Sequence, residues 1–350
     1  MRIAQVSPLY ESVPPKLYGG TERVVAYLTQ ELVCLGHDVT LFASGDSSTD
    51  ARLIAPVEKA LRTNSECIDG IAHHVFMLEL VAQHAKEFDI VHFHVDYLHF
   101  PLSRRLGYRH MTTLHGRLDL SDLKPIFSEF SDMPVVSISE DQKIPLPEVN
   151  WAGTVHHGIP KDLHKFSERP EGYLAFLGRI SPEKRPDLAI EIARRAGKKI
   201  RIAAKVDKAD KEYFKREIEP LLSSPHVEFL GEIGEREKTA FLGGADALLF
   251  PIDWPEPFGL AVIESLACGT PVIAFNRGSV SEILEDGVTG FIVQDVEGAV
   301  QGVKKIRHIE RKTCRRVFEA RFTSSRMASD YEILYNRLLS SDAHAIGPFC

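Results

Sequence analysis

One strand, loop, helix, strand unit in the second half of the chain constrains the fold more than any other feature. A turn with Pro257 and Gly259 precedes a run of good helix formers at Leu260–Ala267. Apolar runs at 247–250 and 272–275 flank this segment, and both are typical of buried strands. A buried strand on each side of a helix predicts a parallel α/β sheet.

The same unit carries two carboxylates at a defined spacing. Glu256 lies in the loop, and Glu264 follows about one turn into the helix, roughly 7 Å along the axis from the helix start. This separation suits two ends of an elongated ligand better than a single proton transfer. The amides of Phe258, Gly259 and Leu260 lie at the helix N-terminus, where an anion is favoured. For a bare pair of Glu residues, complementing the helix dipole is the ordinary alternative.

The residues around the two carboxylates resemble a known family. Seven residues separate the two Glu residues, Phe-Gly-Leu follows the first, and Ala-Cys-Gly-Thr-Pro follows the second. This string is similar to the signature of retaining GT-B glycosyltransferases. The resemblance implies that Glu256 contacts hydroxyls of the donor sugar and that Glu264 contacts the ribose of the nucleotide. It also implies two Rossmann-like, doubly wound domains that face each other across a cleft.

Composition narrows the class of protein. The 350 residues suffice for two domains, and 44% hydrophobic with 26% charged residues is typical of a soluble globular protein. A formal charge of −7 argues against a broad nucleic-acid surface. No apolar run approaches 18 residues and the chain enters a strand directly, so we expect neither a membrane span nor a signal peptide.

Cysteine usage indicates a reducing compartment. The five cysteines are widely scattered, and none has the Cys-x-x-Cys spacing of a zinc or redox site. We therefore expect free thiols and a cytoplasmic location. The five are Cys34, Cys67, Cys268, Cys314 and Cys350.

The first half opens as a doubly wound sheet. Residues 2–7 and 39–43 are predicted strands, and Thr21 is a candidate N-cap of the helix between them. Gly19 and Gly20 precede that helix, where glycines let backbone amides approach a phosphate. The full Gly-x-Gly-x-x-Gly fingerprint is absent, which argues against a dinucleotide dehydrogenase. The glycosyltransferase family has a Gly-Gly-x-Glu element here, and the chain matches it.

Histidines follow the middle strands of this half. His92, His94 and Asp96 alternate along one strand like part of a metallohydrolase ligand set, but Tyr97 stands where that motif continues with His. His115 ends another predicted strand, where open α/β sheets place functional groups. A packing role is the ordinary alternative for a single His. The family has a His at this point, near the donor sugar and often called catalytic.

The resemblance also implies where the chain divides. Residues 1–160 would form an N-terminal domain on the acceptor side, 161–172 a linker, and 173–324 a C-terminal domain that binds the nucleotide sugar. A helix over 325–340 would cross back onto the first domain. His157 replaces the Asn that these enzymes usually have at the hinge.

Basic residues follow the first two strands of the second half. Arg179 and Lys184 match the family's Arg and Lys, which face the negative charge of the nucleotide diphosphate leaving group. Lys205 stands where relatives commonly have glycine, and its ammonium suits either the phosphates or an acidic sugar. Ile233 lies near the expected nucleobase position, where the family uses mainly main-chain contacts. Because these cations and the helix amides can replace Mg²⁺, we expect no essential metal and no cofactor.

These features predict a retaining transfer of a hexosyl unit from a nucleotide sugar to a hydroxyl of a saccharide or glycolipid. UDP-glucose is the favoured donor, and GDP-mannose and UDP-glucuronate are the alternatives. A front-face displacement is what the family implies. Arg104, Arg105 and Arg109 form a local basic patch that can contact an anionic membrane peripherally. Two other classes stay open: another GT-B enzyme, such as a phosphorylase or epimerase, and a non-catalytic nucleotide-sugar-binding protein.

Overall fold

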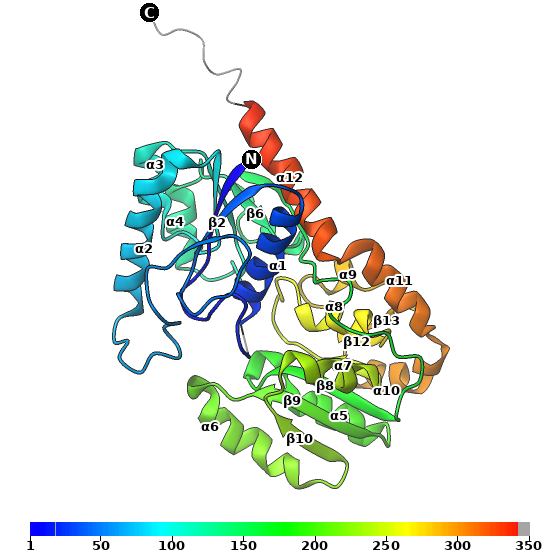
Figure 1. The fold of residues 1–350 in the computed structure, drawn as a ribbon. Helices are drawn as coiled ribbons and strands as arrows, with labels where there is room; N and C mark the ends of the chain where they lie inside the picture. The colour runs from blue at the N-terminus through cyan, green and yellow to red at the C-terminus, as the bar shows by residue number, and fades with distance from the viewer. Residues whose placement is uncertain (18, 342–350) are drawn as a thin grey trace, which may run out of the picture. The chain divides into compact units, whose positions relative to one another are not determined.

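The computed structural model describes residues 1–17 and 19–341 (Figure 1). The chain divides into two compact units. The described residues of the first lie within Met1–Gly158 and Ser324–Ser341, and the second consists of Ile159–Thr323. Tyr18, next to the glycine pair, and Cys350 lie outside the described residues.

The first unit is built on a seven-stranded parallel sheet in the order β3-β2-β1-β4-β5-β6-β7. The chain winds outward in one direction to β3 and in the other direction from β4, so the topological switch point lies between β1 and β4. Ligands of open α/β sheets bind at such points. The strands are β1 (Arg2–Val6), β2 (Asp38–Phe42), β3 (Arg52–Ile54), β4 (Ile90–Phe93), β5 (His110–Thr113), β6 (Val135–Ser137) and β7 (Trp151–Thr154).

Helices surround this first sheet, and two of them pack on each other although they lie at opposite ends of the chain. The first and last described helices, α1 and α12, lie side by side (Figure 1). Val24, Leu28 and Leu32 of α1 are buried, as their four-residue spacing predicts. Tyr331 and Tyr335 of α12 are fully buried in the same unit. The helices are α1 (Gly20–Cys34), α2 (Gly70–His84), η1 (Ala85–Glu87), α3 (Phe100–Leu106), α4 (Leu123–Glu129), η2 (Asp141–Lys143) and α12 (Ser324–Ser341).

The second unit has a six-stranded parallel sheet in the order β10-β9-β8-β11-β12-β13. Its switch point lies between β8 and β11. The strands are β8 (Tyr173–Arg179), β9 (Lys199–Lys205), β10 (Val227–Gly231), β11 (Ala245–Phe250), β12 (Val272–Phe275) and β13 (Gly290–Val293). The predicted strand, loop, helix, strand unit is confirmed: β11 and β12 are paired neighbours, and α8 (Leu260–Ala267) connects them.

Helical segments connect the strands of the second unit or follow its last strand. Gly259 precedes α8 with a φ of 87°, a left-handed conformation that a glycine adopts without the Cβ penalty of other residues. The remaining segments are η3 (Pro182–Lys184), α5 (Pro186–Arg195), η4 (Lys208–Asp210), α6 (Lys211–Tyr213), η5 (Phe214–Ile218), η6 (Glu219–Ser223), α7 (Glu235–Gly243), α9 (Val280–Ile283), α10 (Val296–Lys305), η7 (Ile306–His308) and α11 (Arg311–Arg321).

The four described cysteines are unpaired thiols. Two are buried, and burial raises the pKa of Cys268 and that of Cys314 to about 12 each. Such thiols are unreactive packing groups. Among residues 1–17 and 19–341, no helix has both the length and the apolar character needed to cross a membrane.

Candidate active site

Several predicted donor-site residues lie at one edge of the second sheet. Arg179 is the last residue of β8, Lys205 is the last residue of β9, and the two are register partners. Glu256 lies in the loop that leaves β11, the neighbour of β8 on its other side. Because the carboxyl ends of parallel strands meet at the same edge, this sheet order brings the predicted groups together.

Lys184 and Glu256 form an ion pair at this edge. Lys184 Nζ donates to Glu256 Oε2, and Trp254 Nε1 donates to the same oxygen over 2.9 Å. The ammonium lies 5.0 Å from the centre of the Trp254 ring and 5.6 Å from that of Phe250, within cation–π range. The Glu256 side chain is only 10% exposed. The pair therefore places a cation and a carboxylate together at this edge.

A close approach of two backbone segments holds the Glu256 loop. A Cβ added to Gly278, whose φ is 57°, would lie 2.3 Å from the backbone N of Glu256. The backbone N–H of Ser279 donates to the Glu256 carbonyl over 3.0 Å, and Ser279 Oγ donates to the Phe258 carbonyl over 2.8 Å. The sequence analysis assigned no role to this stretch. It missed Gly278 as the residue that permits the contact.

Arg179 lies among acidic side chains. It forms an ion pair with Glu183 and lies 3.7 Å from Asp207 and 3.8 Å from Asp210. Lys205 Nζ lies 3.2 Å from the same Asp207. A diphosphate would exchange these carboxylate contacts for phosphate contacts, which are of the same charge-assisted kind.

Glu264 is buried in α8 and paired with a lysine that the sequence analysis did not identify. Lys238 Nζ donates to Glu264 Oε1 over 2.8 Å and to Glu235 Oε2 over 3.3 Å. Lys238 is itself only 6% exposed. A lysine on the buried side of α7 was the available sequence signal, because buried Lys is rare unless it is paired. Ile233, the predicted base contact, is half-buried in the loop between β10 and α7, two residues before Glu235.

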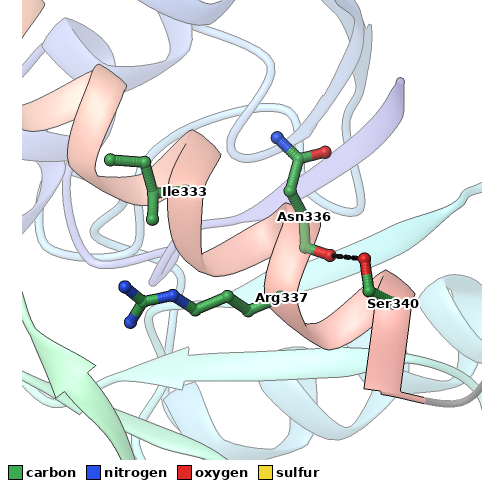
Figure 2. Close-up of a pocket in the computed structure, with 4 residues that line it drawn as sticks. All are labelled: Ile333, Asn336, Arg337 and Ser340. Carbon is green, nitrogen blue, oxygen red and sulfur yellow. Dashed lines mark hydrogen bonds between the residues drawn. The ribbon is translucent and has the colours of Figure 1, made fainter.

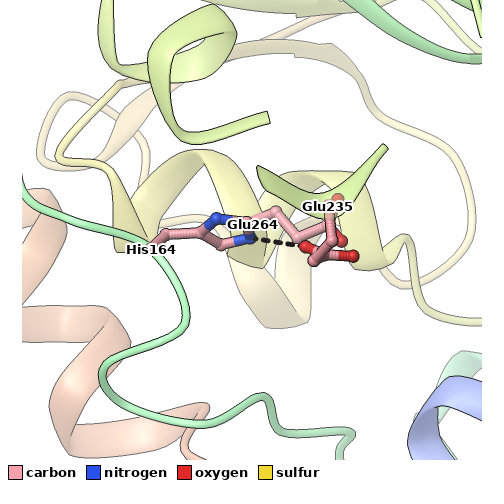
Figure 3. Close-up of side chains that lie close together, drawn as sticks. All are labelled: His164, Glu235 and Glu264. Carbon is pink, nitrogen blue, oxygen red and sulfur yellow. Dashed lines mark ion pairs between the residues drawn. The ribbon is translucent and has the colours of Figure 1, made fainter. Parts of the chain in front are cut away.

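Glu264 and Glu235 also lie close to His164 (Figure 3). His164 Nε2 is 3.3 Å from Glu235 Oε1, and three ligand atoms of this group lie within 4.8 Å of one another. That spacing fits a metal ion. However, the Lys238 ammonium already contacts both carboxylates, and a divalent cation among them would meet it at short range. We therefore assign these carboxylates to Lys238 and not to a metal.

His115 follows β5 in the first unit, within a cluster of histidines. Its Nε2 lies 2.8 Å from His94 Nδ1, and its ring stacks on His157 at 5.2 Å between centroids. Desolvation lowers the pKa of His115 to about 3. The imidazole is therefore neutral at pH 7 and is a weak base.

The His92 and His94 pair is bound by protein groups. The two ring nitrogens of His92 lie 2.7 Å from Tyr335 Oη and 2.7 Å from Thr113 Oγ1. His94 likewise has a partner at each nitrogen. With both nitrogens of both rings engaged, this strand does not present the metallohydrolase ligand set that its spacing resembles.

The glycine pair of the first unit lies at the start of α1. Gly20 is the first residue of the helix, and a Cβ on Gly19 would lie 2.8 Å from Pro15 Cβ, so close packing alone requires a glycine at position 19. Glu22 of the same element is buried, and desolvation raises its pKa. A phosphate contact by these glycines stays a prediction.

A separate hollow of about 520 Å³ is lined by residues of α12 (Figure 2). None of its lining residues belongs to the predicted site, and Ser340 Oγ donates locally to the Asn336 carbonyl over 2.7 Å. One face of one helix does not enclose a ligand, so we assign no function to it. The lining residues are Ile333, Asn336, Arg337 and Ser340.

Comparisons with known proteins match both units. The family model described as Glycosyltransferase Family 4 matches residues 18–134, and the model described as Glycosyl transferases group 1 matches residues 161–321. D-inositol 3-phosphate glycosyltransferase of Mycobacterium tuberculosis is 29% identical over 213 residues. That alignment covers 56% of this chain and 44% of the relative, so it spans less than half of that relative's length.

Solved structures are similar over nearly the whole chain. Sucrose-phosphate synthase from Thermosynechococcus elongatus has a TM-score of 0.79 at 18% identity and covers 97% of this chain and 100% of that one. A glycosyltransferase involved in avilamycin A biosynthesis has a TM-score of 0.75 at 22% identity, covering 97% and 98%. The Anabaena protein HepE in complex with UDP and glucose has a TM-score of 0.73 at 16% identity, covering 96% and 100%.

Two α/β units, each built on a parallel sheet, and these structural matches define the GT-B fold, as predicted. The chain belongs to glycosyltransferase family 4, whose members are also described as group 1 glycosyltransferases. The family resemblance seen around Glu256 and Glu264 is thereby confirmed. The roles of individual residues stay predictions.

Proposed function

We propose that the protein transfers a hexosyl unit from a nucleotide sugar to a hydroxyl group of a saccharide or glycolipid, with retention at the anomeric carbon. The observation that carries the proposal is the Lys184 and Glu256 pair, which lies at the same carboxyl edge of the second sheet as Arg179. Glu256 can accept hydrogen bonds from sugar hydroxyls. Lys184 and Arg179 can neutralise the departing diphosphate, so the reaction needs no essential metal.

The restraint on Glu256 supports a front-face displacement. A retaining enzyme with a covalent intermediate needs a carboxylate free to attack the anomeric carbon. Glu256 Oε2 instead accepts hydrogen bonds from both Lys184 and Trp254, which lowers its nucleophilicity. In the front-face mechanism the leaving phosphate takes the proton of the acceptor hydroxyl as the new glycosidic bond forms.

UDP-glucose is the proposed donor, with GDP-mannose and UDP-glucuronate as alternatives. UDP and glucose occupy the structurally similar Anabaena protein. The contacts of Glu256 with hydroxyls would suit a hexose, and Glu264 would bind the ribose of any of these nucleotides. The Mycobacterium tuberculosis relative is named a D-inositol 3-phosphate glycosyltransferase. We propose a saccharide or lipid hydroxyl as the acceptor class here.

A donor panel tests the function directly. The three nucleotide sugars are incubated with a mixture of saccharide and glycolipid acceptors, and released nucleotide and the anomeric configuration of the product are measured by NMR. We expect acceptor-dependent release of UDP and a product with the anomeric configuration of the donor.

An inverted product contradicts retention. Turnover that needs orthophosphate indicates a phosphorylase, and turnover of the donor without an acceptor indicates an epimerase or hydrolase. Thermal stabilisation without any turnover indicates a binding protein.

Glu264→Gln tests the ribose contact. The amide keeps the shape but weakens two charge-assisted hydrogen bonds, so we expect UDP affinity to fall by about 1–3 kcal/mol. Calorimetry with UDP and GDP measures this. Glu235→Gln is the matched control, because it removes a charge from the same Lys238 network and leaves Glu264 in place. Equal losses in the two variants would mean that network charge, and not a ribose contact, sets the affinity.

Lys205→Ala tests whether the Lys205 ammonium contacts the diphosphate or the sugar of the donor. Lys205 is the register partner of Arg179 and shares Asp207 with it, which favours a diphosphate contact. We therefore expect kcat/KM to fall by a similar factor for all three donors. A loss about 10-fold greater for UDP-glucuronate than for UDP-glucose would instead place Lys205 at a sugar carboxylate. Lys208→Ala, an exposed neighbour, is the control.

A further inference from the structure

Two buried side chains connect the interior of the first unit to His115. Gln5 of β1 and His94, the residue after β4, are 0% and 2% exposed. Gln5 Oε1 lies 2.8 Å from His94 Nε2, and His94 Nδ1 lies 2.8 Å from His115 Nε2. These residues come from three neighbouring strands, next to the switch point between β1 and β4. The chain of contacts therefore ends at the edge where this type of sheet binds ligands.

The donor and acceptor order of this chain follows from the Gln5 amide. An amide oxygen only accepts, so the proton of the Gln5 and His94 contact must be on His94 Nε2. Desolvation lowers the pKa of His94 well below its usual value, so the ring carries only that proton and its Nδ1 is an acceptor. His115 must then donate from Nε2. Its own Nδ1 is left unprotonated.

The hydrogen bonds of the Gln5 amide nitrogen agree with this assignment of donors and acceptors. Gln5 Nε2 donates to Tyr335 Oη over 3.1 Å, and Tyr335 Oη donates to His92 Nδ1 over 2.7 Å. His92 Nε2 then donates to Thr113 Oγ1 over 2.7 Å. Every group in this branch has a donor matched to an acceptor, which is the condition for a buried polar network to be stable.

We propose that Gln5 and His94 are positioning residues that hold His115 in its Nε2–H tautomer, so that His115 Nδ1 accepts a hydrogen bond from a substrate hydroxyl. Within residues 1–17 and 19–341, the buried Nδ1 of His115 has no hydrogen-bond partner. A buried acceptor without a partner is costly, and a hydroxyl ligand would remove that cost. The identity of the ligand as a substrate rests on the proposed glycosyl transfer. His115 then orients a hydroxyl and does not act as the general base.

Ionisable groups face His115 from each adjoining segment. His94 precedes it in the chain of contacts, His157 after β7 stacks on its ring, and the Asp96 carboxylate receives a hydrogen bond from the His115 backbone N–H. Desolvation lowers the pKa values of His94 and His157 well below the usual value. A protonated His115 would place a positive charge between two other imidazoles, so the neutral form persists as the pH falls below 6.5. We expect no titration of His115 in the activity profile between about pH 5 and pH 8.

The tautomers can be measured without any substrate. In full-length protein with ¹⁵N-labelled histidine, long-range proton–nitrogen NMR distinguishes Nε2–H from Nδ1–H rings, and single substitutions assign the signals. We expect Nε2–H at both His94 and His115. A Gln5 amide turned by 180° would reverse every proton in the chain, so Nδ1–H at both residues overturns the proposal.

Two substitutions at one position separate positioning from packing. His94→Leu removes the acceptor and should release His115 into a mixture of tautomers. His94→Asn puts a side-chain oxygen where Nδ1 was and should preserve the Nε2–H form. His99→Asn is the matched control, because His99 is an equally buried histidine bonded to Ser103 and Thr112, outside this chain. It should lower Tm and leave the His115 tautomer unchanged.

Activity gives the second readout. We expect kcat to fall about tenfold or more in His94→Leu and to recover to within about threefold of the parent in His94→Asn. Equal losses in His94→Leu, His94→Asn and His99→Asn would reduce His94 to a structural residue and overturn the proposal. If the expected tautomers are found but no donor supports transfer, the proposed glycosyl transfer is refuted while the positioning of His115 by Gln5 and His94 is supported.

Discussion

Lys184→Ala is expected to lower kcat by about 100-fold or more, with a much smaller rise in KM. Lys184 is bonded to Glu256 in the structure. Negative charge on the diphosphate grows as the glycosidic bond breaks, so the cation gains most of its interaction in the transition state. Arg179→Ala should behave in the same way, for the same reason. Steady-state kinetics with the best donor of the panel measure both parameters.

A neighbouring arginine provides the control for this prediction. Arg185 follows Lys184 directly, but its guanidinium is bonded to Asp187 at 2.8 Å and to Asp253 at 3.4 Å, and it is not among the predicted donor-site residues. Arg185→Ala should change kcat by less than about threefold. A raised KM with unchanged kcat in the Lys184 and Arg179 variants would make these residues ground-state binding groups, contrary to the proposed mechanism.

Gly278→Ala is expected to cost about 2–4 kcal/mol of folding free energy and to lower kcat/KM by about 10- to 100-fold. The new Cβ would lie 2.3 Å from the backbone N of Glu256 and 2.4 Å from its carbonyl oxygen, so the Glu256 loop must move. Displacing Glu256 also displaces the oxygen that Lys184 and Trp254 contact. Chemical denaturation and kinetics of the same preparation measure the two effects.

Gly287 offers a control that isolates backbone strain from the steric contact. Its φ is 72°, close to that of Gly278, but within the described chain a Cβ there would have nothing within 4 Å. Gly287→Ala should therefore cost only the left-handed conformational penalty of about 1–2 kcal/mol and leave kcat/KM near the parent value. Similar losses of activity in the two variants would show that the contact with Glu256 is unimportant.

The segment around α8 was predictable because its signals are local. Pro257 and Gly259 define the turn, helix formers follow, and the apolar runs on either side form β11 and β12. The spacing of Glu256 and Glu264, with its flanking residues, was enough to identify the family. Turn chemistry, helix propensity and strand hydrophobicity act over a few residues, so each leaves its mark on a short stretch of sequence.

The partners of the same residues were not predictable in this way. Lys238 is 26 residues from Glu264 in the chain, and Lys184 is 72 residues from Glu256. Only the order of strands β9-β8-β11-β12 brings these groups to one edge. In the sequence, His92 and His94 have the spacing of metal ligands. In the folded unit, their ring nitrogens instead bond to Tyr335, Gln5 and other protein groups.

The amino-acid sequence by itself determined the alternation of strands and helices, the family, and which residue types stand at the ends of the strands. Those properties depend on side chains within one element or one turn. The tertiary structure alone decided that Lys238 neutralises the buried Glu264, that Gly278 supports the Glu256 loop, and that Gln5 reaches His115 through His94. Hydrogen bonds and ion pairs need their atoms within about 3–4 Å, and only the packing of elements distant in the chain sets such distances.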